Sequence, residues 1–209
     1  MAVQHARHLL SLEGPLFGHL ELPLNAWLDS VPALAVVACY CYAALHYVAT
    51  PTVLLLSRRR GGWRYWRGWW TLVLTSAMAL VVYALYPVAP PRLVPGLGVV
   101  DVLRSYADYG WWGSAASAPR GIGDATNQYA ALPSMHLGWA LWCGIQMWGF
   151  GSRGWRVLAV TYPGLLSVIV LATGNHFLVD VLAGAGCVLL AHVALELGHR
   201  RRAHRRAGT

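Results

Sequence analysis

The stretch that decides the fold runs from Leu132 to Asp180. It opens with LPSMH (132–136) and closes with NHFLVD (175–180), and two long apolar segments, 132–150 and 176–197, begin at these motifs. A helix of about 20 apolar residues is long enough to span a bilayer. Each polar motif therefore stands where a predicted membrane helix begins.

The two motifs carry two histidines and one carboxylate, His136, His176 and Asp180. His176 and Asp180 are four positions apart, so on a helix they share one face, and the carboxylate can hydrogen-bond one ring nitrogen while the other faces a substrate. A histidine held in this way is prepared to act as a nucleophile or a base. Ionisable side chains at the depth of a membrane indicate function by default.

Composition assigns the chain to the integral membrane proteins. Of 209 residues, 57% are hydrophobic and 11% are charged, whereas a soluble domain carries about 25% charged residues. The 11 Trp and 10 Tyr cluster near segment ends, which suits the headgroup region of a bilayer. All 16 basic residues are arginines in short clusters at span ends, and this arrangement argues against a nucleic-acid partner.

These patterns predict an all-α fold, a bundle of about five transmembrane helices preceded by an N-terminal interfacial segment. Residues 1–30 are too polar to span and too apolar to be a free tail, so we expect short interfacial pieces there. Residues 31–198 form the membrane-embedded domain, and residues 199–209 form a basic cytoplasmic tail that we expect to be disordered. The expected spans are 31–56, 69–86, 132–150, 157–173 and 176–197, with an arginine-rich loop at 57–68.

The connection between the second and third spans holds most of the other polar residues. Prolines 87, 90 and 91 forbid a continued helix and keep the chain extended, so Arg92 is presented at a membrane surface on a stiff backbone. Residues 94–131 are polar and glycine-rich and include Arg120. A connection this long is uncommon unless it is functional, for example as a lid or a binding surface.

The arginines also predict the orientation of the chain. If the odd connections face the cytoplasm, twelve of the 16 arginines lie on that side, and the other side keeps only Arg7, Arg92, Arg104 and Arg120. An excess of Arg in cytoplasmic loops sets the orientation of membrane proteins. We therefore expect a multi-pass protein of the cell membrane whose active site faces away from the cytoplasm.

This set of residues suits phosphoryl transfer through a phosphohistidine. In this hypothesis His176 attacks phosphorus, Asp180 orients its ring, and His136 protonates the leaving oxygen and later deprotonates the acceptor. Arginine recognises phosphate oxygens in a bidentate manner, which makes Arg92 and Arg120 candidates for a phosphate clamp. Beside the histidines, Ser134 at a helix start and Asn175 in a turn are further candidates for substrate binding.

The motifs resemble those of a known family. Pro-Ser-Met-His (133–136) followed by Asn-His-x-x-x-Asp (175–180) resembles the second and third signature motifs of the type 2 phosphatidic acid phosphatase superfamily. Tyr-Pro-Val-Ala-Pro-Pro-Arg (86–92), together with the residues that precede each histidine, is similar to its inositol phosphorylceramide synthase-like branch of inositolphosphotransferases. The resemblance covers roughly residues 10 to 200 and rests on the ordered set of three motifs.

The resemblance implies a lipid phosphatase or phosphotransferase with His176 as nucleophile, Asp180 as its orienting acid and His136 as leaving-group acid. It also implies a helical bundle with the site at one membrane face, and a mechanism that needs no metal or organic cofactor. The chain departs from the superfamily in two places. It has no Lys for the first motif, and Ile169 and Val170 stand where Ser-Arg is usual, so Arg92, Arg120 or another loop arginine must supply the charge of the phosphate cage.

Several alternatives stay open. The expected partners are membrane lipids and a lipid phosphate or diphosphate, and the acceptor is either water or an alcohol such as inositol. A protein of another class, a non-catalytic binder or carrier of phospholipid headgroups, could use the same arginines and helix ends. A metal site is a poorer hypothesis, because two histidines and one carboxylate at these spacings match no metal motif and the nearby arginines repel a cation.

Overall fold

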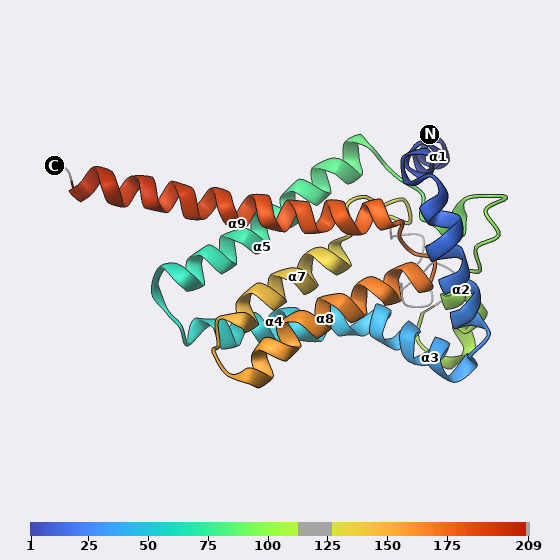
Figure 1. Ribbon diagram of the computed structural model, residues 1–209, viewed down its shortest axis with the longest axis horizontal. Coiled ribbons are helices and arrows are strands. Elements are labelled where there is room, and N and C mark those ends of the chain that lie inside the picture. The colour runs from blue at the N-terminus through green and yellow to red at the C-terminus, as the bar shows by residue number, and fades with distance from the viewer. Residues whose placement is uncertain (113–126, 208–209) are drawn as a thin grey trace.

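The computed structural model describes residues 1–112 and 127–207, and Figure 1 shows them as an elongated bundle of helices. Within these ranges the regular elements are helices and helical turns, and isolated bridges occur, such as the one between Val88 and Ala130. The prediction of an all-α membrane protein is confirmed.

The N-terminal segment forms three short helical pieces at one end of the bundle. They are α1 (Ala2–Glu13), the π-helical turn η1 (Phe17–Glu21) and α2 (Leu22–Asp29). Their apolar side chains pack into the bundle end, and two of their carboxylates, Glu13 and Glu21, are buried as well. These pieces help to form the region in which both histidine motifs lie.

The first crossing is assembled from α3 (Pro32–Tyr40), the π-helical turn η2 (Cys41–Leu45) and α4 (His46–Arg58). Together they make one apolar helical run from Pro32 to Arg58. Wide turns of this kind inside α-helices occur frequently at functional sites, because they redirect side chains.

The second crossing, α5 (Gly62–Leu85), begins earlier than the sequence predicts. Residues 57–68 were expected to form a loop, but α4 ends at Arg58 and α5 starts at Gly62, so only a tight turn separates them. Gly61 and Gly62 supply positive φ angles of 59° and 51° in this turn, a conformation that costs glycine little. Beyond the turn, Arg is a good helix former, and the helix continues toward the membrane without a break.

The connection after α5 contains the 3-10 turn η3 (Pro91–Leu93), the short helix α6 (Val102–Ser105) and the 3-10 turn η4 (Ala107–Tyr109). Before these turns the chain is extended, and Val88 pairs with the segment that leads into the first histidine motif. The Val88 N–H donates to the Tyr129 carbonyl at 2.8 Å, and the Ala131 N–H donates to the Val88 carbonyl at 3.3 Å. The proline-rich segment thereby fixes the chain just before α7.

Helix α7 (Met135–Trp148) lies at the centre of the bundle. It packs against α4, α5, α8 (Arg153–Ala172) and α9 (Leu178–Ala207). Its 14 residues extend about 21 Å, which is shorter than the predicted span 132–150. A central helix surrounded by others needs less length than a lipid-exposed one, because its ends are covered by protein.

Helix α9 is the longest element, with 30 residues, and it corrects two predictions. It begins at Leu178 and not at His176, and residues 200–207 continue it as helix, so the expected disorder of the tail is wrong. Arg and Ala are among the better helix formers, and Glu196 forms ion pairs with Arg67 on α5 and with Arg200 one turn further along α9. In Figure 1 this end of α9 projects beyond the other helices.

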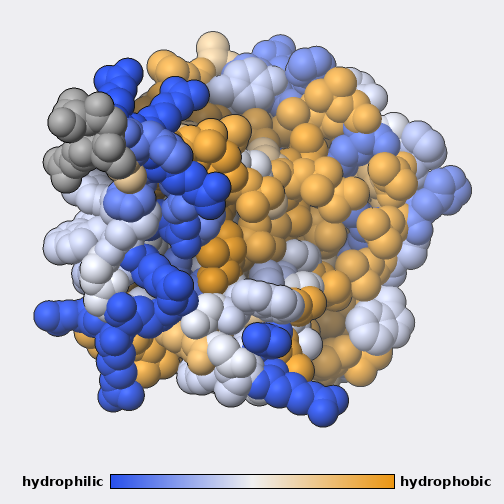
Figure 2. Space-filling model, turned by 60° about the vertical axis from the view of Figure 1, so that its left-hand side comes forward, coloured by the Kyte–Doolittle hydropathy of each residue, from blue (hydrophilic) through white to orange (hydrophobic). Residues whose placement is uncertain are grey.

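Among the described residues, four helical runs are long and apolar enough to cross a membrane: Pro32–Arg58, Gly62–Leu85, Arg153–Ala172 and Leu178–Arg205. Large apolar side chains cover their outer faces, and Leu80 and Leu190 are 66% and 68% exposed. Figure 2 shows a broad apolar face with hydrophilic residues gathered toward its margins. The predicted count of five spans stays a prediction, because the remaining candidate, α7, is shorter than these four runs.

The arginine clusters gather at the end of the bundle that includes the α4–α5 turn, the start of α8 and the end of α9, on the left in Figure 1. The Arg60 guanidinium donates to the Gln146 carbonyl at the end of α7 (3.2 Å), and Arg156 lies over the Trp148 ring at 5.8 Å. We call this the arginine end. The N-terminal helices α1 and α2 lie at the opposite end.

Candidate active site

His176 lies in the turn between α8 and α9, two residues before α9 begins. Gly174, with a φ of 71°, allows the chain to reverse directly after α8. The N–H groups of Asn175 and His176 then both donate to the Val170 carbonyl at 3.2 Å, which closes the turn onto the end of α8. The expectation that His176 sits on the same helix as Asp180 is therefore wrong, although the two residues are still neighbours.

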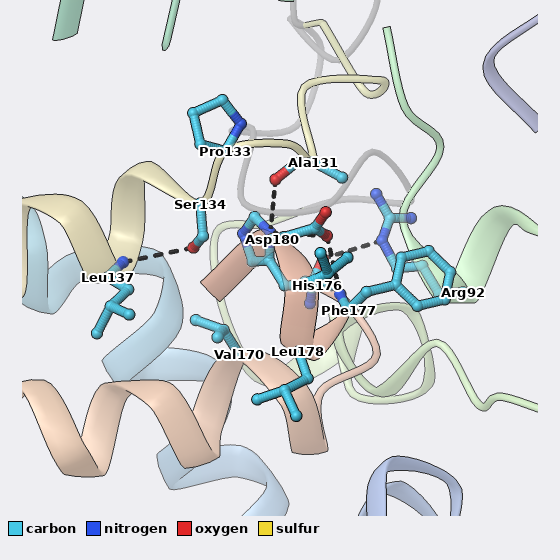
Figure 3. Close-up of polar contacts among 12 residues, drawn as sticks. Arg92, Ala131, Pro133, Ser134, Leu137, Val170, His176, Phe177, Leu178 and Asp180 are labelled. Atoms are coloured by element: carbon cyan, nitrogen blue, oxygen red, sulfur yellow. Dashed lines mark hydrogen bonds and ion pairs between the residues drawn. The ribbon is translucent and has the colours of Figure 1, made fainter. Parts of the chain in front are cut away.

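The ring of His176 is oriented by a backbone carbonyl. Its Nδ1 lies 3.0 Å from the carbonyl oxygen of Ala131, as Figure 3 shows, and 3.6 Å from Oδ2 of Asp180. Because a carbonyl oxygen can only accept, Nδ1 carries the proton and Nε2 keeps a lone pair in the neutral ring. This is the tautomer that a nucleophilic histidine requires, and Asp180 supplies a negative charge beside it without a direct hydrogen bond.

Asp180 uses its carboxylate to start α9. Its Oδ2 accepts the N–H of Phe177 at 2.8 Å, so Asp180 stands at the third helical position and bonds back to the residue that precedes the helix, one half of a capping box. Its Oδ1 is buried and accepts no hydrogen bond from the described residues. The predicted Asp180–His176 hydrogen bond is replaced by this cap because the helix starts after the histidine.

The first histidine motif meets the second one at this point. Ser134 caps α7, with its Oγ accepting the N–H of Leu137 at 3.4 Å, and its own N–H donates to the Asp180 carbonyl at 2.9 Å. This bond joins the start of α7 to the first turn of α9. The rings of His136 and His176 are consequently 5.7 Å apart between centroids, although 40 positions separate them in the sequence.

The side chain of Arg92 is buried and is held by two acceptors. Its Nε donates to Oδ1 of Asn175 and its Nη1 to Oδ2 of Asp101, both at 2.9 Å, and its backbone N–H donates to the Gly174 carbonyl at 3.0 Å. Arg92 therefore lies against the turn that carries His176. Asn175, a candidate for substrate binding, orients Arg92 in this structure, and the other clamp candidate, Arg120, lies outside the described residues.

Sequence reasoning missed two aromatic neighbours of His136. Tyr42, in the π-helical turn η2, stacks on the His136 ring at 4.3 Å, and His46, at the start of α4, meets it edge-on at 4.4 Å. Nδ1 of His46 and Nε2 of His136 are buried and have no hydrogen-bond partner among the described residues. The available signal was the position of His46 inside an apolar span, where an ionisable side chain is rare.

Two carboxylates from the N-terminal segment were also missed. Glu21 accepts the N–H of Leu178, and Glu13 accepts the N–H of Val179 at 2.6 Å, so both lie at the start of α9. Burial, followed by the charge of Glu13, raises the pKa of Glu21 to about 8, and burial also raises the pKa of Glu13. Two Glu residues in a segment that is too polar to span were the only signal in the sequence.

The described part of the chain holds no group of three or more His, Cys, Asp or Glu side chains arranged to bind a metal ion. Glu13 and Glu21 accept backbone N–H groups through one oxygen each, and Asp180 does the same. Metal-independent chemistry stays a prediction.

These features define a class: a membrane-embedded helical protein with two histidines, a carboxylate and a buried arginine at one end of its bundle. In a comparison with protein families, the profile described as the PAP2 superfamily matches residues 7–194. The chain belongs to this superfamily, that of the type 2 phosphatidic acid phosphatases, and membership indicates a membrane-bound lipid phosphatase or phosphotransferase. No curated protein and no solved structure matched the chain.

Proposed function

We propose that the protein transfers or hydrolyses a phosphate group on a membrane lipid through a covalent phosphohistidine at His176. The observation that carries this proposal is the placement of the His176 ring. Its Nδ1 is hydrogen-bonded to the Ala131 carbonyl, and its centroid lies 5.7 Å from that of the His136 ring. A nucleophile with a lone pair on Nε2 and a second histidine at this separation fit the two halves of a phosphoryl-transfer reaction.

In the first half, Nε2 of His176 attacks phosphorus, the bond from phosphorus to the leaving oxygen breaks, and His136 gives that oxygen a proton. The ring of His176 becomes positively charged in the phosphorylated state, and Asp180, 3.6 Å from Nδ1, stabilises this charge. In the second half, His136 takes a proton from the acceptor, the acceptor oxygen attacks phosphorus, and the bond to His176 breaks.

The phosphate oxygens need positive partners, and two lie near the histidines. Arg92 has five N–H groups, of which the bonds to Asn175 and Asp101 occupy two. The start of α7, which carries His136, presents the positive end of a helix dipole. The start of α9 serves less well, because Glu13, Glu21 and Asp180 already accept its N–H groups. We therefore assign phosphate binding to Arg92 and the α7 start.

The substrate we propose is a lipid phosphate or diphosphate, and the acceptor is either water or an alcohol such as inositol. The resemblance of residues 86–92 and 173–176 to inositolphosphotransferases favours the alcohol. The starts of α7 and α9, next to which His136 and His176 stand, lie at the end of the bundle opposite to the arginine end. Arg in short loops favours the cytoplasm. This supports a site in the cell membrane that faces away from the cytoplasm.

The decisive test is covalent trapping. Purified protein is mixed with a ³²P-labelled lipid phosphate, quenched in base, where phosphohistidine survives, and analysed for label on the protein. We expect acid-labile label on the wild type and none on the His176→Ala variant, whose turnover should fall by several orders of magnitude. His199→Ala is the matched control, because His199 stacks on Trp63 at the arginine end. Lipid binding without label or turnover would support the headgroup carrier instead.

A further inference from the structure

Glu13, the last residue of α1, and Glu21, the last residue of η1, meet at the start of α9. Glu21 accepts the N–H of Leu178 and Glu13 accepts that of Val179, the first two residues of the helix. The N–H groups of a first helical turn have no partner inside the helix. The N-terminal segment thus caps the N–H groups of Leu178 and Val179, whereas Asp180 caps only that of Phe177.

Both carboxyl groups are buried, with residue exposures of 8% for Glu13 and 5% for Glu21. Each uses Oε1 for the cap, while Oε2 of each is buried and accepts no hydrogen bond from the described residues. Because their Oε1 atoms bind the N–H groups of two adjacent residues, Leu178 and Val179, the two carboxyl groups lie close together. A carboxylate can accept a hydrogen bond but cannot donate one. A single proton on one of the two groups therefore supplies the donor that a hydrogen bond between them requires.

The charges around this pair favour retention of that proton. The charge of Asp180 on α9 adds to the effect of burial and raises the pKa of both groups. No arginine forms an ion pair with either group within the described ranges. The basic side chains of α1 bond elsewhere, to the segment from Tyr86 to Pro95.

We propose that Glu13 and Glu21 share one proton and act as positioning residues, which hold the start of α9 and thereby place His176 and Asp180 for the transfer reaction. This inference rests on the proposed function of His176. The pair does not touch the reacting atoms. It acts through Leu178 and Val179, which adjoin the turn that carries His176.

The proposal predicts how the start of α9 responds to pH. The pKa of Glu21 is raised from its ordinary 4.5 to about 8, chiefly by burial. The pair therefore binds the proton more tightly when the first turn of α9 is closed, as in this structure, than when that turn is open. The contribution of the proton to stability is complete below about pH 4.5 and is lost as the pH rises through about 8. The opening constant of the first α9 turn should rise by up to about tenfold per pH unit in this window and level off above it.

Hydrogen–deuterium exchange of residues 176–182, measured in lipid nanodiscs between pH 5 and 9 and corrected for intrinsic rates, tests this directly. In Glu21→Gln the amide oxygen still accepts the Leu178 N–H and the NH₂ group donates to Glu13, so we expect protection that does not depend on pH. Glu196→Gln is the matched control, because Glu196 lies on the same helix but pairs with Arg67 at the arginine end, and it should keep the wild-type pH dependence.

Turnover provides the second readout. We expect the wild type to lose activity as the pH rises through about 8, Glu21→Gln to lack this alkaline fall, and Glu196→Gln to show it unchanged. Glu21→Ala removes the acceptor, so kcat should fall about tenfold at every pH with little change in KM. A Glu21→Gln variant with the wild-type alkaline fall and wild-type exchange would overturn the proposal.

The two readouts separate this inference from the function on which it rests. If the exchange of residues 176–182 shows the expected pH dependence but no lipid phosphate is turned over, the proton-sharing pair is supported and the phosphohistidine proposal fails. If turnover is normal and exchange at Leu178 and Val179 is insensitive to both pH and Glu21→Gln, the pair is refuted and the proposed function stands.

Discussion

Gly184 of α9 lies directly against the backbone of Ser134, so closely that a Cβ atom on Gly184 would be 2.2 Å from the Ser134 carbonyl oxygen. No real side chain tolerates such a contact with backbone. The absence of a side chain at position 184 therefore allows the start of α7, with Ser134 and His136, to approach the first turns of α9.

We expect Gly184→Ala to push the start of α7 away from α9 and to lower kcat by about a hundredfold, since displacements near 1 Å at an active site can have this effect. Gly186→Ala is the matched control, because a Cβ at Gly186 meets nothing within 4 Å. It should retain wild-type turnover and thermal stability. Equal activity of the two variants would show that the α7–α9 contact does not set the histidine geometry.

Two substitutions of Asp180 distinguish the effect of its negative charge from the effect of its helix cap. In Asp180→Asn the side-chain oxygen still accepts the Phe177 N–H, but the negative charge 3.6 Å from Nδ1 of His176 is lost. We expect a loss in kcat of about a hundredfold or more, with the fold intact. Asp180→Ala should lose the cap as well and be less stable than Asp180→Asn by about 1 kcal/mol in thermal unfolding. Similar kcat values for Asp180→Asn and the wild type would show that turnover does not depend on the charge of Asp180.

The role of His136 as a general acid predicts a dependence on the leaving group. His136→Ala should lower turnover of a lipid phosphate by about 10²–10⁴-fold, but that of an activated aryl phosphate far less, because a good leaving group scarcely needs a proton. The ratio of the two losses is the measurement. Equal losses on both substrates would assign His136 to packing against Tyr42 and His46 instead.

Arg92→Lys tests the phosphate clamp. A lysine ammonium cannot hold Asn175, Asp101 and a phosphate in the planar geometry of a guanidinium, so we expect both a higher KM and a lower kcat. Arg104→Lys serves as the control, because Arg104 is an exposed residue of the same connection. If the two variants behave alike in steady-state kinetics, another group binds the phosphate.

The sidedness of the membrane can be measured with single cysteines in a variant that lacks the four native ones. A cysteine at Ser105 should react with a membrane-impermeant maleimide in intact cells, whereas one at Ser152 should react only after permeabilisation. Both positions are exposed, and Ser152 lies at the arginine end. The opposite pattern would turn the histidines toward the cytoplasm.

The sequence predicted the features that depend on local pattern. Apolar runs gave the crossing helices, and the polar motifs at their starts gave His136, His176 and Asp180, which the structure brings together. Arg92 was likewise predicted as a site residue, on the proline-rich segment that lies against the turn of His176. Chain-local rules could not predict that α9 starts after His176, because its cap is completed by Glu13 and Glu21, and these residues are more than 150 positions away.

The contacts around His136 escaped prediction for a related reason. Tyr42 and His46 are four positions apart and share one face of the first crossing, but no local pattern tells that this face meets the start of α7, which follows about 90 positions later. The tight turn at Gly61 and Gly62 was missed because five arginines within 57–68 resemble a loop by composition. Helix propensity and the positive φ of the glycines decided the outcome instead.

The cap on α9 also bears on the order in which the protein is assembled. Glu21 and Leu178 are separated by 157 positions and Glu13 and Val179 by 166, so during biosynthesis the two carboxyl groups enter the membrane surface long before their partners exist. Contacts between such distant positions close late. His176, the proposed nucleophile, therefore reaches this geometry only when the last helix has been inserted, and under the proposed function a nascent chain does not act on the lipids that surround it.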